Sequence, residues 1–266
     1  MIATENTCAF SGAELYLLSM IADGETLIGV RDPFVGWLTE EIGEQLESVR
    51  DNLRVRGYVL TRDVGVGIEP SLAPLIAALA APRIAVIVTR HHPGHDLEER
   101  AYHIGRTSTV KLSQHGQHYQ LEPIAESAIA ADICGWWGLH TQGAAPGVPF
   151  KLEQVALLAA RDTAHDEAAA AALLSELGAT ATTAAAFAAT LHAPQINGSF
   201  AALRRGAAGW EVSGIALLAS ALGLWRLRAF EHHAAPWVEL APTAAAELRQ
   251  RVERLLRHTI SAANRV

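Results

Sequence analysis

The sequence predicts an α+β fold made of two similar halves. Three observations lead to this prediction: a short segment that occurs twice, two series of short strands joined by tight turns, and amphipathic helices around each series. In the repeated segment, residues 117–137 and again 236–256, an apolar strand leads into Leu-x-Pro and then into an apolar helical stripe. The two copies are separated by 119 residues (242 − 123).

The constant offset aligns residues of the same kind along both copies. The matched pairs are Leu121/Leu240, Pro123/Pro242, Ala125/Ala244, Ile129/Leu248 and Ile133/Val252. The offset also aligns the strand-like residues 107–113 with 226–232. Proline is favourable at the first helix position because its φ is already helical and its missing N–H needs no partner there, so we predict that both prolines open helices. Because such helix starts are common, convergent local chemistry is the alternative to duplication.

The first half alternates helices and strands. Ser11 and Glu14 form a capping-box pattern that opens a helix with Leu15, Leu18 and Ile21 on one face. A long amphipathic helix over residues 39–56 is acidic at its start, basic at its end and stopped by Gly57. The other predicted elements are a strand at 26–30, a helix at 70–80, and strands at 83–90, 100–104, 108–112 and 117–121.

A segment rich in glycine, alanine and proline, residues 141–149, reads as a linker between the halves. It divides the chain into an N-terminal half, 1–140, and a C-terminal half, 150–266, which we expect to form one two-lobed domain. The second half is predicted to contain helices at 151–161, 165–177 and 181–192, strands at 195–204, 210–218, 224–231 and 237–240, and a closing helix at 242–257.

Composition and charge narrow the function. The net charge of −7 and the pI near 5.9 provide no basic field for nucleic acid. No apolar run approaches the ~20 residues of a membrane span, and the first residues lack a secretory signal pattern, so we expect no membrane insertion. Cys8 and Cys134 have no disulfide or metal-site spacing, which favours a reducing cytoplasm.

The usual catalytic motifs are absent from the sequence. It has no dinucleotide-binding glycine pattern, no phosphate-binding loop, no serine-hydrolase elbow and no zincin motif. Nucleotide binding, serine hydrolysis and zincin chemistry therefore lose their usual support, and we expect no cofactor.

One histidine cluster leaves a metal site open. His91, His92, His95 and Asp96 offer three imidazoles and a carboxylate, and Pro93-Gly94 could turn the chain so that they converge. The alternative is a polar hairpin tip, because one local cluster without distant ligands rarely completes a coordination shell.

Alanines and tryptophans each allow two interpretations. The alanine-rich residues 156–202 predict either an ordinary helical bundle or a groove that accepts an amphipathic helix. The tryptophans predict a core or lobe junction, with an exposed anchor for a partner as the alternative. The tryptophans in question are Trp136, Trp137, Trp210, Trp225 and Trp237.

The order of elements resembles the EspG proteins, cytosolic chaperones of bacterial type VII (ESX) secretion that bind PE/PPE client pairs. The stretches that carry the resemblance are residues 10–15, 53–58, 70–72, 147–152 and 237–242. The likeness extends over nearly the whole chain. It implies a pseudo-two-fold α+β fold, with a central, largely antiparallel sheet flanked by helical bundles, and no enzymatic activity.

The resemblance also implies a client site made by a loop between central strands and by the C-terminal helical bundle. By element order the loop is residues 91–97, and the bundle lies in residues 151–192. The client-binding residues implied in this way are His91, His92, His95, Leu97, Val155, Leu158, Leu173, Leu174, Leu177 and Phe187.

Two classes of function follow. The first is a non-enzymatic cytosolic chaperone or adaptor that shields the apolar helical tip of a secretion client, PE/PPE-like or another helical secreted protein. The alternatives are a small metal-dependent hydrolase using His91, His92, His95 and Asp96, or an EspG-fold protein with an unrelated binding function. A homodimer is also possible.

Overall fold

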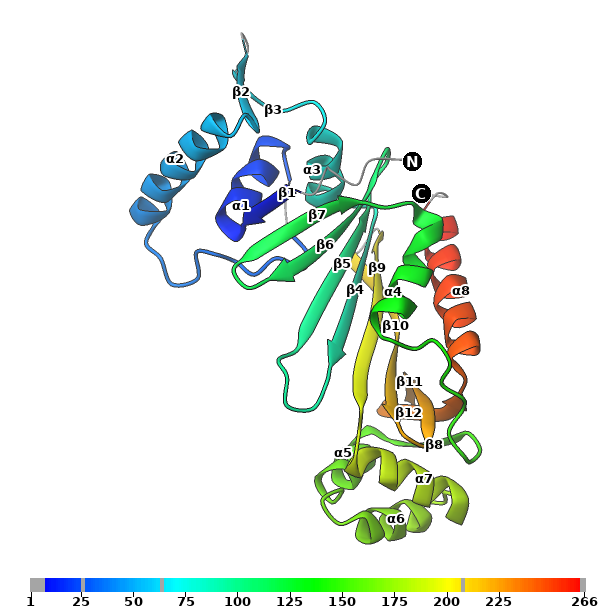
Figure 1. The fold of residues 1–266 in the computed structure, drawn as a ribbon. Helices are drawn as coiled ribbons and strands as arrows, with labels where there is room; N and C mark the ends of the chain where they lie inside the picture. The colour runs from blue at the N-terminus through cyan, green and yellow to red at the C-terminus, as the bar shows by residue number, and fades with distance from the viewer. Residues whose placement is uncertain (1–7, 25–26, 63–64, 207–208, 264–266) are drawn as a thin grey trace.

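The computed structural model describes residues 8–24, 27–62, 65–206 and 209–263 (Figure 1). The strands of the main sheet are β1 (Cys8–Ser11), β4 (Ile84–His91), β5 (Glu98–Ile104), β6 (Thr109–His115), β7 (His118–Pro123), β8 (Phe150–Glu153), β9 (Ile196–Gly206), β10 (Gly209–Ser220), β11 (Gly223–His232) and β12 (Ala235–Thr243). A separate hairpin comprises β2 (Val59–Arg62) and β3 (Gly65–Ile68). The helices are α1 (Gly12–Ile21), α2 (Thr39–Val55), α3 (Ala73–Ala80), the 3-10 turn η1 (Glu126–Ala128), α4 (Ile129–Trp136), α5 (Gln154–Asp162), α6 (Glu167–Glu176), α7 (Ala181–His192) and α8 (Ala245–Ala263).

The main sheet has ten strands in the order β1-β7-β6-β5-β4-β9-β10-β11-β12-β8, and every neighbouring pair is antiparallel. The meanders β4–β7 and β9–β12 run outward from the centre in opposite directions. The α+β prediction with a largely antiparallel sheet is therefore confirmed.

The sheet register reveals the pseudo-two-fold relation between the halves. The two innermost strands pair with Val88 opposite Phe200. At the two edges, Cys8 of β1 lies opposite Leu121, and Phe150 of β8 lies opposite Leu240. Since Leu121 and Leu240 are a matched pair of the repeat, the edge strands occupy equivalent positions. The predicted pseudo-two-fold fold is correct.

The constant offset of 119 residues does not hold for β6 and β11, the strands that lie next to β7 and β12 on the side of the sheet centre. Pro123 lies opposite Val110, whereas Pro242 lies opposite Trp225. Val110 and Trp225 are thus equivalent, at an offset of 115 (225 − 110). The sequence alignment of these strands is wrong by four residues, because the β11–β12 hairpin is longer than the β6–β7 hairpin.

The two repeat prolines do not open helices, contrary to the prediction. Pro123 is the last residue of β7 and Pro242 lies within β12, while α4 and α8 begin farther on, at Ile129 and Ala245. Proline disfavours a helical conformation in the residue before it, so Leu-x-Pro prolongs the strand.

The predicted strand at 26–30 is also wrong for residues 27–30, which the structure describes. Residues 27–30 form a turn in which Gly29 has φ of +76°, and Thr26 lies outside the described residues. The strands β1, β2, β3 and β8 were not predicted. Each has only four residues, so its periodic signal is too short to read, and pairing with another strand stabilises it.

Helices cover both faces of the sheet, and in the part of the chain that the structure describes they define three apolar cores. On one face α4 and α8 pack over the central strands, and the matched residues Ile129, Ile133, Leu248 and Val252 are all fully buried there. On the other face α1–α3 cover one end of the sheet and α5–α7 cover the other end (Figure 1). None of the helices in the described residues combines the length and apolarity needed to span a bilayer.

The tryptophan positions favour the core interpretation. Trp137 and Trp225 are fully buried, one in the core under α4 and α8 and the other in the core under α5–α7. Trp210 is partly exposed on β10. In the crossing segment 141–149, Ala144 bridges to Leu224, so this segment lies against the second half of the sheet.

Candidate binding groove

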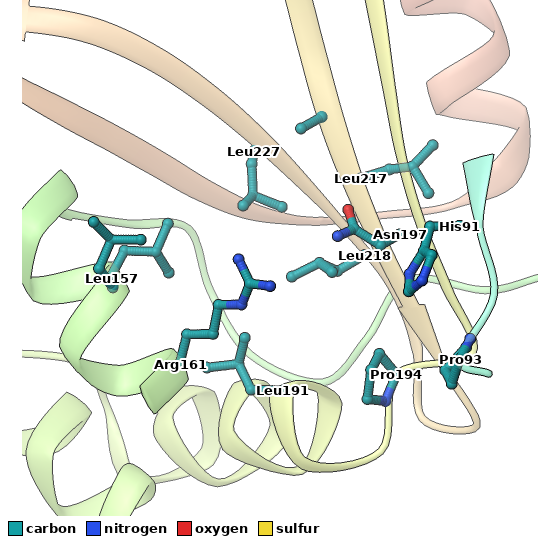
Figure 2. Close-up of a pocket in the computed structure, with 12 residues that line it drawn as sticks. His91, Pro93, Leu157, Arg161, Leu191, Pro194, Asn197, Leu217, Leu218 and Leu227 are labelled. Atoms are coloured by element: carbon teal, nitrogen blue, oxygen red, sulfur yellow. The ribbon is translucent and has the colours of Figure 1, made fainter. Parts of the chain in front are cut away.

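A cavity of about 370 Å³ lies between the β4–β5 hairpin and the α5–α7 bundle, on the face of the sheet away from α4 and α8 (Figure 2). Its lining residues come from both halves of the chain. They are His91, Pro93, Leu157, Leu158, Arg161, Leu191, Pro194, Asn197, Ala216, Leu217, Leu218 and Leu227. Most of these side chains are apolar, so the cavity is suited to an apolar occupant.

The sheet forms the floor of the groove. Side chains alternate along β10, so Leu217 packs in the core under α4 and α8, while Leu218 joins the core of the α5–α7 side. Leu227 of the neighbouring strand β11 lies on the same side as Leu218. The end of β9 contributes Asn197, which pairs with His91 in the sheet register.

The β4–β5 hairpin forms one wall. Its loop is held close to the sheet because the His92 Nδ1 atom lies 3.1 Å from the carbonyl oxygen of Gln195, just before β9. The far end of the loop is open to solvent, and Leu97 is 60% exposed. The hairpin thus presents His91 to the cavity, while Leu97, just before β5, lines a separate depression.

Helix α5 forms the opposite wall. Leu157, Leu158 and Arg161 line the cavity from this helix, and Leu191 and Pro194 line it from the end of α7. Residues three or four positions apart share a helix face, so Leu157 and Arg161 point the same way.

The structure divides the predicted client-binding residues into surface and core. His91 and Leu158 line the groove, and Val155 and Leu177 are exposed on the bundle. Three other bundle positions lie inward: Leu174 and Phe187 are fully buried in its core, and Leu173 packs partly buried against it. His92, His95 and Leu97 lie on the hairpin.

Burial of Leu174 and Phe187 has a simple physical reason. The Phe187 ring packs edge-on against the Trp225 ring, with centroids 5.2 Å apart, and anchors α7 to the sheet. These two residues therefore support the bundle from within its core.

Sequence reasoning missed several lining residues. These are Pro93, Leu157, Arg161, Leu191, Pro194, Asn197, Ala216, Leu217, Leu218 and Leu227. The one available signal was the Leu157-Leu158 pair followed by Arg161 at helical spacing on α5. The strand residues gave no such signal, because the sequence does not say which stretch of a sheet face its helices leave open.

The histidine cluster is not arranged as a metal centre. The His92 and His95 rings are 6.3 Å apart, and the Nδ1 atom of His95 faces the Pro93 carbonyl at 3.3 Å. His91 faces the groove, whereas Asp96 lines a different depression. Within the described ranges, no three His, Cys, Asp or Glu side chains are grouped to hold an ion. The polar hairpin tip is the better description.

Arg90 clamps the loop end of this hairpin. Its guanidinium donates to both carboxylate oxygens of Glu98, at 2.9 and 2.7 Å, and to the backbone carbonyl of Trp136. The guanidinium carbons of Arg90 and Arg100 each lie 4.7 Å from the centre of the Trp136 ring. The hairpin wall is thereby tied to the end of α4.

Replacing Arg90 by glutamine is expected to loosen the hairpin. Loss of about 1 kcal/mol of local stability would raise amide hydrogen exchange in residues 92–98 about fivefold. Hydrogen-exchange mass spectrometry checks this. Arg204→Gln is a matched control, because Arg204 is 22% exposed against 21% for Arg90 and pairs with Glu211 on the other central hairpin. Equal exchange in the hairpin of wild type and Arg90→Gln would contradict the clamp.

Comparison with known proteins gives a consistent result. The sequence model of the EspG family matches residues 33–254. No curated protein matches the sequence. Among solved structures, the type VII secretion system chaperone EspG5 of Mycobacterium tuberculosis, solved in complex with a PE25–PPE41 dimer, is similar with a TM-score of 0.68. The two sequences are 15% identical, and the similarity covers 96% of each chain, so this likeness shows a shared fold.

Proposed function

The chain belongs to the EspG family, and from that premise we propose that it is a non-enzymatic chaperone for a helical secretion client of the PE/PPE kind. The similar EspG5 structure contains a PE25–PPE41 dimer, which supports a client of this class. We place its action in the bacterial cytoplasm, before the client is secreted.

The observation that carries the proposal is the groove itself. The β4–β5 loop and the C-terminal bundle are the two elements that the family resemblance implies for client binding, and they flank one apolar cavity. Two exposed apolar side chains of α5 form one wall and its continuation: Leu158 lines the cavity, and Val155 lies three positions before it on the same helix face. Such a grouping on a protein surface is typical of an interaction site.

The mechanism is burial. An apolar tip on a helical client would favour aggregation while exposed, and its removal from water contributes ~25 cal/mol for each Å². The two lobes, residues 1–140 and 150–266, act as one body, because β4 and β9 pair across the centre of a continuous sheet. The groove can therefore hold the client without a bond being made or broken.

The proposal predicts that Val155→Asp weakens client binding at least tenfold, because a carboxylate at the rim would lose its water against an apolar partner. The test is affinity capture from the cytosol of the source bacterium, with the partner identified by mass spectrometry as a helical secreted protein. Val212→Asp is the matched control, since both valines are 66% exposed, but Val155 lies on α5 three positions before the lining residue Leu158, whereas Val212 lies on β10 near its start.

Equal recovery of the helical partner by wild type and Val155→Asp would show that the proposed surface does not bind the client. Zinc or manganese bound stoichiometrically to the purified protein would instead favour the hydrolase alternative. The possible homodimer stays a prediction, which light scattering on the purified protein tests.

A further inference from the structure

Arg161 places a positive charge in a groove that is otherwise mostly apolar. Figure 2 shows its side chain reaching from α5 into the space between Leu157 and Leu218. The other polar side chains of the lining are those of His91 and Asn197, on the opposite side of the cavity, and no lining residue is acidic.

The Arg161 guanidinium has no ion-pair partner among the described residues. Many other arginines of the chain are paired with carboxylates: Arg50, Arg54, Arg56, Arg90, Arg100, Arg204, Arg226, Arg228, Arg249 and Arg251. In a chain of net charge −7, Arg161 thus places a cation beside three leucines of the cavity lining. In the free protein the Arg161 guanidinium is exposed, so water molecules solvate its charge and accept its hydrogen bonds.

A purely apolar partner would remove that water. Covering Arg161 in this way would leave a desolvated charge without a counter-ion, which is strongly unfavourable. A carboxylate can instead accept two parallel hydrogen bonds from a guanidinium, in a geometry that a lysine or an amide cannot reproduce. The groove therefore discriminates against uncharged apolar segments as well as favouring acidic ones.

We propose that the groove accepts a client segment in which an aspartate or glutamate lies within one helical turn of a large apolar side chain. The apolar side chain occupies the floor at Leu218 and Leu227, and the carboxylate pairs with Arg161. This inference rests on the proposed chaperone function and names the chemistry of the client. A protein segment is favoured over a small molecule because an exposed apolar side chain, Val155, lies one helical turn beyond the lining residue Leu158 on α5.

The test uses a display library of random dodecapeptides, selected against the full-length wild-type protein. Peptides that also bind a Leu158→Asp variant are discarded, which leaves those that need the groove. The expected sequences combine leucine, phenylalanine or methionine with an acidic residue up to four positions away. A selected peptide should bind at least about tenfold more tightly than its glutamine counterpart.

Three variants separate charge from shape. Arg161→Met keeps an unbranched side chain of good helix propensity and should bind the acidic and glutamine peptides equally. Arg161→Glu should prefer peptides with lysine or arginine instead. Arg254→Met, which removes an exposed arginine from α8 on the other face of the sheet, should keep the wild-type preference.

The outcomes distinguish this inference from the function on which it rests. Groove-dependent peptides without acidic residues, or a preference unchanged in Arg161→Glu, would overturn the role of Arg161 while leaving the groove intact. Selection of only those peptides that still bind Leu158→Asp would overturn the groove and the inference together. Binding of oleate that Leu158→Asp abolishes, with no peptide selected, would assign the groove to a lipid.

Discussion

Replacing Trp137 by alanine is expected to lower the free energy of unfolding by about 3–5 kcal/mol. This tryptophan is fully buried in the core under α4 and α8. Its indole Nε1 donates to the carbonyl oxygen of Thr89 at 3.0 Å, which joins the end of α4 to β4. The variant thus leaves a large cavity and loses the hydrogen bond to the strand that carries the hairpin wall. Urea denaturation followed by circular dichroism measures the loss.

Trp225 provides a matched control for the hydrogen-bond contribution. It is equally buried, but its Nε1 has no hydrogen-bond partner among the described residues. Trp225→Phe removes an N–H donor that has no partner among the described residues, whereas Trp137→Phe removes an existing hydrogen bond. We expect Trp137→Phe to cost about 1 kcal/mol or more beyond Trp225→Phe. Equal costs would show that the bond to Thr89 contributes nothing.

His103 is expected to make the fold sensitive to acid. Burial of this β5 side chain lowers its pKa from 6.5 to about 4, and the backbone of Ile28 opposes the shift only partly. Neither ring nitrogen has a hydrogen-bond partner of good geometry among the described residues. Between pH 6.5 and about pH 4, the imidazole of His103 therefore stays neutral in the folded protein, whereas it is protonated in the unfolded chain.

The sign of the pH effect follows from linkage. Because the unfolded state binds the proton more readily, stability falls as the pH falls from about 6.5 toward 4, by about 1.4 kcal/mol per pH unit. Wild type should lose about 2 kcal/mol between pH 7 and pH 5 that a His103→Leu variant retains. The measurement is the free energy of unfolding in urea at both pH values. Parallel losses in the two proteins would rule out His103 as the cause.

The client-site prediction stays a prediction, but the elements that it names can be located around the groove. Element order placed the β4–β5 loop and the C-terminal bundle together, and both flank the groove. It could not decide which bundle residues face outward, because the alanine-rich helices are weakly amphipathic and present small apolar side chains on several faces. Leu174 is therefore fully buried and Leu177 exposed, although both were predicted at the client site from the same segment.

The sequence by itself determined most of the helices, the two meanders and the repeated Leu-x-Pro segment. These features depend on local periodicity, capping residues and tight turns, all of which are written within a few consecutive positions. The matched helix residues Ile129 and Leu248 were identified in this way, and both are fully buried.

Only the tertiary structure decided the true register of the halves, the four-residue edge strands and the position of Arg161 above an apolar floor. Each of these depends on contacts between residues far apart in the chain. Such contacts form when strands from both halves join one sheet, and no local pattern specifies which side chains that joining leaves uncovered.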